Sequence, residues 1–322
     1  MVDSTQEQTS TDESARIELR KYQRAQQVRT TVRRSLVFVI FVTILGLLYT
    51  GYKVAGQSID DAQRDWPVIG SVLPATNDLI MPPISAIISE FNDPPQRRNP
   101  KTLGGFIFDA ALFTAREAFF GFVAGVVLGF GLAVLMLRSR TIERGLMPYV
   151  VVSQTVPLVA IAPIIVIWGQ TNFGWLPFTW NAWMSVSIIA TYLTFFPVAV
   201  NGLKGLQSPS AEAVELMESY ASSRTQTLLK LRLPASVPYL FAAFKLAASA
   251  SIVGAIVGEI SSGVGGGIGR LILDFASRYT TGPERLYASV AGAAVLGIVV
   301  FGLISLLERY VAGGRERETS TL

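Results

Sequence analysis

Long apolar runs constrain this sequence more than any other feature. Each run holds about 20 or more mostly apolar residues, the length that crosses the roughly 30 Å hydrocarbon core of a bilayer as a helix. Half of all residues are apolar and only 16% are charged, against about 25% charged in ordinary soluble domains. The sequence therefore predicts an all-α integral membrane protein with about six transmembrane helices, near residues 35–56, 105–137, 147–169, 181–203, 236–260 and 286–307.

The chain contains no cysteine and no histidine. Their absence excludes disulfides, Cys/His zinc sites, and the catalytic mechanisms that need a cysteine nucleophile or a Ser-His-Asp triad. The formal net charge of +4 is explained by basic cytoplasmic flanks of a membrane protein. We therefore expect no catalytic residue, no metal site and no nucleic-acid partner.

Basic residues are distributed unevenly between the two sides of the predicted bundle. If residues 1–34 are cytoplasmic, the inner segments hold seventeen Lys and Arg residues and the outer segments hold eight over a similar length. Cytoplasmic loops of membrane proteins carry such an excess. The bias predicts that both termini are cytoplasmic, in agreement with an even number of spans.

The same pattern divides the chain into segments. The first apolar run begins some 34 residues into the sequence and has no clear small-residue cleavage site after it. Both features argue against a removable signal peptide. The segment that follows this run, residues 57–104, is rich in proline, which excludes a continuous helix there. Within it, residues 80–91 could form a short amphipathic segment on the membrane surface. We expect a polar and basic cytoplasmic tail at 1–34, a first transmembrane helix at 35–56, an extracytoplasmic connection at 57–104, a transmembrane domain at 105–312 and a cytoplasmic tail at 313–322.

Small residues recur at intervals of three or four in two of the predicted spans. Residues at this spacing share one helix face, and small side chains let another helix approach closely in a membrane. We interpret both stripes as packing interfaces, with a pore-lining role as the alternative. They are Gly121, Gly125, Gly129 and Ala133 in the second span, and Ala243, Ala247, Ala250, Gly254 and Gly258 in the fifth.

Prolines interrupt the third span at Pro148, Pro157 and Pro163. A proline inside a spanning helix frees a carbonyl group, which must then be satisfied by protein or by water in a cavity. The third span is therefore predicted either to line a path or to be kinked against a neighbouring helix.

Few ionisable residues lie within the spans, and each would cost roughly 2.5–3.5 kcal/mol if it faced lipid at mid-bilayer. They are Arg116, Glu117, Lys245 and Glu259, and both glutamates are expected near span ends. Lys245 is close enough to the inner boundary to extend its amine to the interface. Glu259 precedes the glycine-rich run 263–269, so we expect a helix break there, with Glu259 anchoring it or contributing to an outer gate.

A polar segment at 204–235 separates the fourth and fifth spans. Its apolar positions have helical spacing and predict an amphipathic helix too short to span, with Ser208 or Ser210 as its N-cap. Such a helix either docks another protein or lies flat on the membrane. The apolar positions are Ala213, Leu216, Met217, Tyr220 and Ala221.

This segment resembles the EAA loop of binding-protein-dependent ABC importer permeases. The family pattern is Glu-Ala-Ala, three residues, Gly, nine residues, Ile, one residue, Leu-Pro. Alanine replaces the glycine here, and because alanine tolerates a positive φ poorly, the sequence leaves the geometry of that turn open. The matching positions are Glu215, Leu216 and Met217, then Ala221, Leu231, Leu233 and Pro234.

Other stretches over residues 80–310 resemble the nitrate/sulfonate/taurine branch of that family, in the expected order. One departure is Glu117, where the family has an arginine four residues before Gly121-Phe122. The matching stretches include Met81-Pro-Pro, Gly121-Phe122, Trp168-Gly169, Phe195-Phe-Pro, Glu259 and Gly267-Ile-Gly269.

The resemblance implies a transmembrane domain of the type I ABC importer kind, in a bacterial or archaeal cytoplasmic membrane. It implies ATPase subunits, an extracytoplasmic substrate-binding protein and a second permease subunit, expected to be an identical copy, as partners. ATP and Mg²⁺ would bind the ATPase, because this chain has no G-x-x-x-x-G-K-[ST] loop. The path is expected to be lined from the third to fifth spans, with Gln154, Thr155, Thr191, Thr194, Ser249 and Ser251 as candidates.

Two other classes of function compete with this interpretation. An ATP-independent secondary transporter or channel would place ion-coupling carboxylates near mid-membrane. A polytopic membrane enzyme would need a carboxylate site at the membrane face, for which Glu212, Glu215 and Glu218 are the available residues. These three side chains share one short helix and are more typical of a solvated or docking face.

Overall fold

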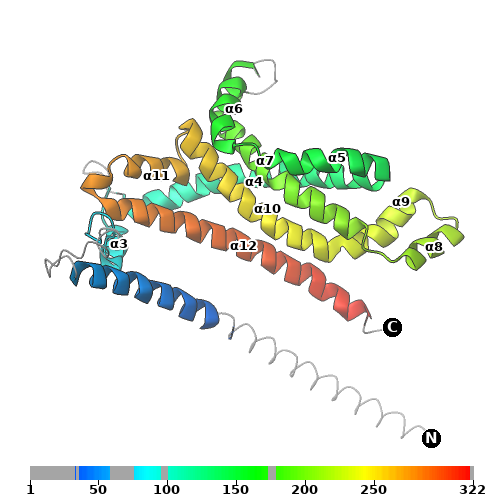
Figure 1. Cartoon of the computed structure of the whole chain (residues 1–322), viewed down its shortest axis with the longest axis horizontal. Helices are drawn as coiled ribbons and strands as arrows, with labels where there is room; N and C mark the ends of the chain where they lie inside the picture. Colours follow the sequence, from blue (N-terminus) through cyan, green and yellow to red (C-terminus); the bar gives the residue numbers. More distant parts are fainter. Residues whose placement is uncertain (1–32, 34–35, 59–75, 96–100, 173–178, 320–322) are drawn as a thin grey trace, which may run out of the picture. The chain divides into compact units, whose positions relative to one another are not determined.

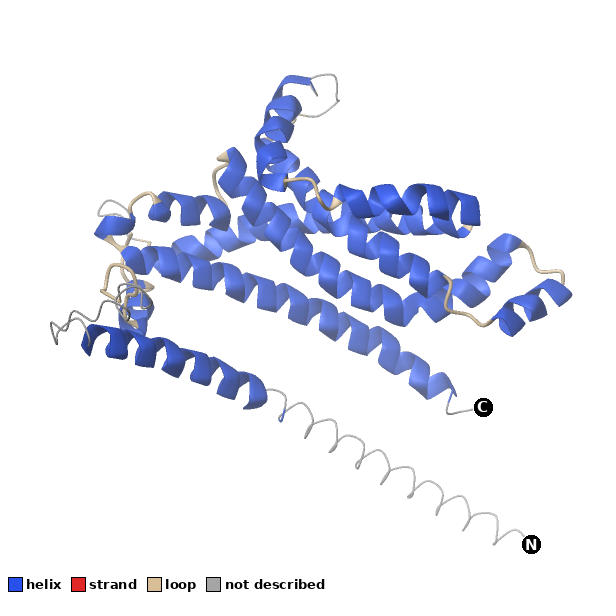
Figure 2. Ribbon diagram, viewed as in Figure 1, coloured by secondary structure: helices blue, strands red, loops and turns tan. Residues whose placement is uncertain are grey.

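The structure is a computed structural model that describes residues 33, 36–58, 76–95, 101–172 and 179–319. The regular elements in these ranges are helices, and no strand occurs among them (Figure 2). The chain forms two compact units, residues 1–85 and 86–322. The predicted all-α class is therefore confirmed.

The first unit contains the apolar helix Leu36–Ser58. Its C-terminal half is held to the segment that follows the connection, because the Lys53 amine pairs with the Asp78 carboxylate at 2.6 Å. The Tyr49 hydroxyl also donates to the Pro82 carbonyl oxygen at 2.8 Å. The hydrogen bond and charge of Lys53 lower the pKa of the Asp78 carboxyl, so the pair remains ionised at neutral pH.

Three long helices form the centre of the second unit (Figure 1): α4 (Leu103–Leu137), α7 (Ala182–Leu206) and α10 (Leu233–Ser262). They are apolar around most of their circumference, as expected for helices surrounded by lipid and by other helices. Thr102 caps α4 by accepting a hydrogen bond from the Gly105 amide. Gly263, at φ 69°, ends α10, which confirms the predicted helix break after Glu259.

The two stripes of small residues are helix interfaces, as predicted. A Cβ atom at Gly121 or Gly125 would overlap Ala190 or Thr194 of α7. On the other side of α7, a Cβ at Gly254 would lie 2.8 Å from the Cα of Ala190. Helix α7 is thus packed between α4 and α10 at backbone-to-backbone distances that only small residues allow.

The third predicted span is not one straight helix. It consists of α5 (Arg140–Ser153) and α6 (Leu158–Asn172), which meet at an angle of 95°. The break lies immediately before Pro157, which has no amide hydrogen to continue the helical hydrogen bonding and disfavours helical geometry in the residue before it. Within the described ranges, five helices are long and apolar enough to cross a membrane, or six if the bent pair counts as one span. The predicted number of about six is confirmed.

Short elements close both ends of this bundle. At one end lie α8 (Ala211–Ser219), α9 (Arg224–Thr227) and the π-helical segment η1 (Leu228–Arg232). At the other end are α11 (Ile268–Ala276), the 3₁₀ turn η2 (Tyr279–Thr281) and the start of α12 (Pro283–Thr319) (Figure 1). The C-terminal end of α12 lies at the same end of the bundle as α8 and α9 (Figure 1).

Two ion pairs connect α12 to the rest of the second unit. Arg285 pairs at 2.6 Å with Glu90 of α3 (Ile84–Glu90). Lys245 of α10 pairs at 2.5 Å with Glu308. The Lys245 amine is therefore neutralised by a neighbouring helix instead of extending alone to the membrane interface.

Candidate functional site

Helix α8 is the predicted amphipathic helix, and its start is defined by a side-chain cap. The Ser210 hydroxyl oxygen accepts a hydrogen bond from the Ala213 amide at 3.3 Å, whereas the Ser208 hydroxyl donates to the Gly205 carbonyl. Ser210 is therefore the N-cap. Hydrogen bonds from the backbone amide of Glu212 and from Ser210 lower the pKa of the Glu212 carboxyl, so the first turn of α8 carries a negative charge, which favours the helix dipole.

No residue of α8 is buried. Leu216 is 57% exposed and Tyr220, just after the helix, is 77% exposed. Glu215 is exposed beside them, and Met217 is half-buried. A capped helix that presents two large apolar side chains and a carboxylate to solvent has the features of a docking surface.

The turn after α8 adopts the conformation that the family's glycine would provide. Ala221 has a φ of 53°, and among the described residues no other residue except glycine has a positive φ. The amide of Ser222 donates to the Met217 carbonyl at 3.0 Å, and the amide of Ala221 donates to the Glu218 carbonyl at 2.8 Å. This pair of bonds is a Schellman motif, in which glycine is usual at the left-handed position. The motif is therefore closed here with alanine at the left-handed position.

Leu233 and Pro234 lie within a helix and do not form a turn between the loop and the fifth span. The helix is continuous from Arg224 to Ser262. Its π-helical segment η1 ends where the Leu233 amide donates to the Leu228 carbonyl, five residues earlier. The wider π turn accommodates a proline, which lacks an amide hydrogen and would clash with a carbonyl in a regular α-helix. The loop is therefore joined to α10 by helix.

Two further contacts fix the base of this loop. Ser223 and Gln226 form a reciprocal capping box at the start of α9. The Arg232 guanidinium donates to the carbonyl oxygen of Leu206, at the C-terminal end of α7, at 2.9 Å. A basic side chain at a helix C-terminus satisfies a free carbonyl and interacts favourably with the helix dipole. Neither the Arg232 contact nor the η1 segment was predicted, because both depend on how α7 and α10 pack.

At the other end of the bundle, Glu259 is fully buried and holds the glycine-rich turn. Its carboxylate accepts from the Thr114 hydroxyl at 2.7 Å and from the Gly269 amide at 2.6 Å. Thr114 in turn accepts from the Ile268 amide at 2.9 Å. A Cβ at Gly267 would overlap the Glu259 carboxylate. The anchoring role predicted for Glu259 has this geometric basis, while the gating role stays a prediction.

Glu117 is also fully buried, near the middle of α4 instead of near an end of its span. Its carboxyl faces that of Glu259. Thr114 was missed from the sequence, although it lies three residues before Glu117 and therefore on the same helix face. That spacing was the available signal.

The path candidates are dispersed over different environments. Thr194 and Ser251 are buried in helix interfaces, and Thr155 and Ser249 are exposed. Gln154 and Thr191 are half-buried. The hydroxyls of the four Ser and Thr candidates in helices donate to backbone carbonyls of their own helices. The hydroxyl of Thr155, which lies between α5 and α6, donates to the Val152 carbonyl of α5. Their role in a path stays a prediction.

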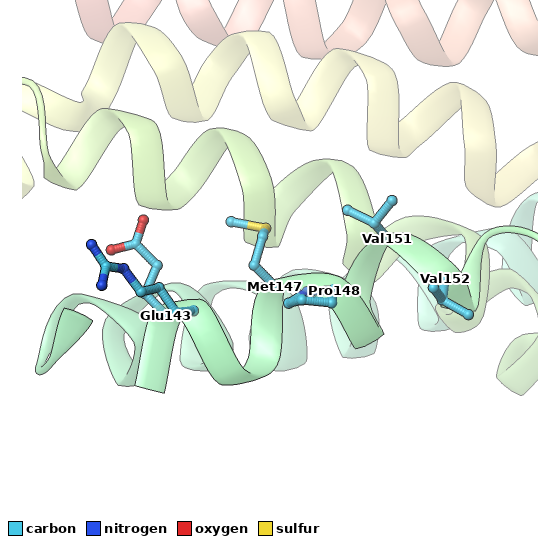
Figure 3. A pocket seen from close by; sticks show the side chains of 6 residues that line it. Glu143, Met147, Pro148, Val151 and Val152 are labelled. Carbon is cyan, nitrogen blue, oxygen red and sulfur yellow. The ribbon is translucent and has the colours of Figure 1, made fainter. Parts of the chain in front are cut away.

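A pocket lies along α5 (Figure 3). It is lined mainly by apolar side chains, together with two charged residues near the start of the helix, Glu143 and Arg144. One of these, Glu143, accepts from the Gln207 amide group at 3.1 Å. None of the predicted path residues lines this pocket. Its lining residues are Glu143, Arg144, Met147, Pro148, Val151 and Val152.

Comparison with known families identifies the chain. Residues 125–313 match the family described as binding-protein-dependent transport system inner membrane component, which is more than half of the sequence. The chain belongs to this family. Together with the helical spans, membership shows a multi-pass membrane permease with a transmembrane domain of the type I ABC importer kind.

Three curated relatives of this permease illustrate the branch. The formylaminopyrimidine transport permease protein ThiX of Halalkalibacterium halodurans is 30% identical, over 62% of this chain and 74% of its own. The putative aliphatic sulfonates transport permease protein SsuC of Bacillus subtilis is 26% identical, over 76% and 81%. The nitrate import permease protein NrtB of Leptolyngbya laminosa is 25% identical, over 89% and 86%. The predicted resemblance is confirmed.

Proposed function

We propose that this permease is the transmembrane subunit of an ATP-driven importer, and that α8 is the helix through which a separate ATPase moves it. One observation carries the proposal: a capped helix with exposed Leu216, Tyr220 and Glu215 is joined to α10. Membership of a binding-protein-dependent family supports it. The competing secondary-transporter and enzyme interpretations are not needed to explain any of these features.

The coupling would be mechanical. Force on α8 passes through the closed turn at Ala221 and the capping box at Ser223 into the helix that becomes α10. Arg232 ties the same point to the end of α7. Motion of α8 would therefore tilt α7 and α10 together and open the path alternately to each side.

The remaining partners follow from the family. An extracytoplasmic binding protein would deliver the solute, and a second permease subunit, expected to be an identical copy, would complete the path in a bacterial or archaeal cytoplasmic membrane. The relatives named for nitrate and aliphatic sulfonates favour a small anion as the solute, and the formylaminopyrimidine relative favours a small heterocycle as the second possibility.

Substitution of Glu215 tests the proposal. The complex that co-purifies with the chain is reconstituted in vesicles, and ATP hydrolysis is measured with and without the binding protein and solute. We expect Glu215→Ala to leave the complex assembled while solute-stimulated hydrolysis falls, because an exposed carboxylate contributes to docking and not to folding.

A matched control is Glu284→Ala, which removes a carboxylate from the start of α12 at the opposite end of the bundle. Its stimulated hydrolysis should equal that of the unmodified complex. Undiminished transport in Glu215→Ala, or an equal loss in both variants, would contradict the coupling role.

A further inference from the structure

Two carboxyl groups meet in the interior of the bundle. Glu117 of α4 and Glu259 of α10 both have no solvent exposure. Thr114, on the same face of α4 as Glu117, donates a hydrogen bond to the Glu259 carboxylate at 2.7 Å, so the two carboxyl groups lie close together in the interior. Two negative charges in contact at a site of low dielectric repel strongly, so such a pair does not remain doubly ionised without a compensating positive charge.

The two carboxyl groups differ in their hydrogen bonds. One oxygen of Glu259 accepts from the Thr114 hydroxyl and the other accepts from the backbone amide of Gly269. Among the residues that the structure describes, neither oxygen of Glu117 has a hydrogen-bond donor. The hydrogen bonds therefore stabilise Glu259 in its ionised form, and no such hydrogen bonds stabilise an ionised Glu117.

Among the residues that the structure describes, no basic side chain forms an ion pair with either glutamate. Arg116 is exposed, with its guanidinium 4.0 Å from the centre of the Trp183 ring. Arg270 of α11 pairs with Asp274 at 3.0 Å. In the remaining helices that pack here, Lys245 pairs with Glu308 and Arg285 pairs with Glu90. Lys204 of α7 and Arg309 of α12 are exposed.

We propose that Glu117 and Glu259 together bind one proton, carried on Glu117 and donated to the Glu259 carboxylate. This assignment gives each oxygen of Glu259 its donors and turns Glu117 from an unsatisfied acceptor into a donor. Glu259 and Thr114 hold the backbone amides of Gly269 and Ile268 at the start of α11. The bound proton therefore contributes to the contacts that hold α11 against α10. The proposal does not depend on how the permease is driven.

Proton binding at this site has a consequence for stability. The folded chain keeps a proton that a glutamate in the unfolded chain releases above about pH 4.3. A folded state that binds more protons than the unfolded state loses stability as the pH rises. Removing the ability of residue 117 to ionise should remove this contribution to the pH dependence.

The experiment uses the full chain in detergent or lipid nanodiscs. Infrared spectra at pH 7 report protonated carboxyl groups by their carbonyl stretch, which shifts on exchange into heavy water. We expect such a band in the unmodified chain and its loss in Glu117→Gln. The melting temperature of the unmodified chain should fall between about pH 5 and pH 8, and Glu117→Gln should reduce that fall. Glu284→Gln, the matched control, should keep both the band and the fall.

Other results would overturn the proposal. If the unmodified chain shows no band from a protonated carboxyl group at pH 7, the proposal is wrong. This result requires no variant, so it tests the proposal even if Glu117→Gln does not fold. Retention of the band in folded Glu117→Gln would overturn the proposal as well. A melting temperature that responds to sodium or potassium concentration at constant pH, in the unmodified chain and not in the variant, would assign the site to a metal cation instead.

Discussion

The backbone amide of Ser222 donates a hydrogen bond to the Met217 carbonyl oxygen at 3.0 Å, and this bond closes the turn at the end of α8. The residue between them that reverses the chain, Ala221, adopts φ 53°. Left-handed geometry costs roughly 1–2 kcal/mol in residues with a Cβ atom. The turn that ends α8 therefore forms here against a local conformational cost.

Replacing that alanine should stabilise the loop. Ala221→Gly removes the left-handed cost, partly offset by the greater freedom of glycine in the unfolded chain, for a net gain of about 0.5–1 kcal/mol. Hydrogen exchange of the Ser222 amide, measured by mass spectrometry, should become slower. Ala213→Gly, inside α8, is the control and should accelerate exchange, since glycine costs about 1 kcal/mol in a helix interior. Faster exchange in Ala221→Gly would show that the turn is not under this strain.

The glycine-rich turn at the other end provides a steric test. Gly267→Ala places a methyl group against the Glu259 carboxylate, whereas a Cβ atom at Gly265 would have no neighbour within 4 Å. Overpacking of a tight site costs typically about 1–3 kcal/mol. Gly267→Ala should therefore lower the melting temperature of the purified chain, and Gly265→Ala should leave it nearly unchanged. Equal melting temperatures for the two variants would refute the close contact.

The packing of α4 on α7 predicts a similar contrast. Gly125→Val would drive a branched side chain into Thr194 and the backbone at Thr191, while Gly131, on the same helix, has open space around it. We expect the fraction of Gly125→Val that elutes as a folded species from size-exclusion chromatography to fall severalfold. Gly131→Val should match the unmodified chain. A normal yield of folded Gly125→Val would mean that α4 and α7 are not in close contact.

The Lys245–Glu308 ion pair should show a charge-reversal rescue. Each side chain keeps only part of its surface exposed, 25% and 30%, so loss of one partner leaves a poorly hydrated charge and should cost about 1–3 kcal/mol. Thermal unfolding of Lys245→Glu, Glu308→Lys and the double variant forms a complete cycle. The double variant should recover most of the stability that each single variant loses; additive losses would exclude a direct interaction.

The parts of the fold that follow from periodicity and from single-residue chemistry could be predicted from the sequence. Small residues every fourth position indicated the contacting faces of α4 and α10, because that spacing defines one face of a helix. The glycine run at 263–269 marked the end of α10, and the alternatives Ser208 and Ser210 marked the start of α8, where the structure selects Ser210. Each of these features is local, so the nearby sequence contains all the information that it needs.

The parts that depend on the packing of distant segments could not be predicted. Glu117 meets Glu259 across 142 positions of sequence, and no spacing rule connects them. Proline usually ends a helix, but the helix continues through Leu233 and Pro234 because the π-helical segment before them accommodates the proline. Ala221 adopts a glycine-like conformation that its side chain disfavours, because the bonds on either side of it hold the turn closed.

Cross-linking at α8 tests the central claim most directly. The chain has no cysteine, so Leu216→Cys introduces a single reactive thiol on the exposed face of α8, and Ser277→Cys introduces one just after α11 at the other end of the bundle. A short bifunctional reagent applied to native membranes should join position 216 to an ATPase subunit, identified by mass spectrometry, and should not join position 277 to it. Capture of the ATPase from position 277, or labelling of position 216 only from the extracytoplasmic side, would contradict the account.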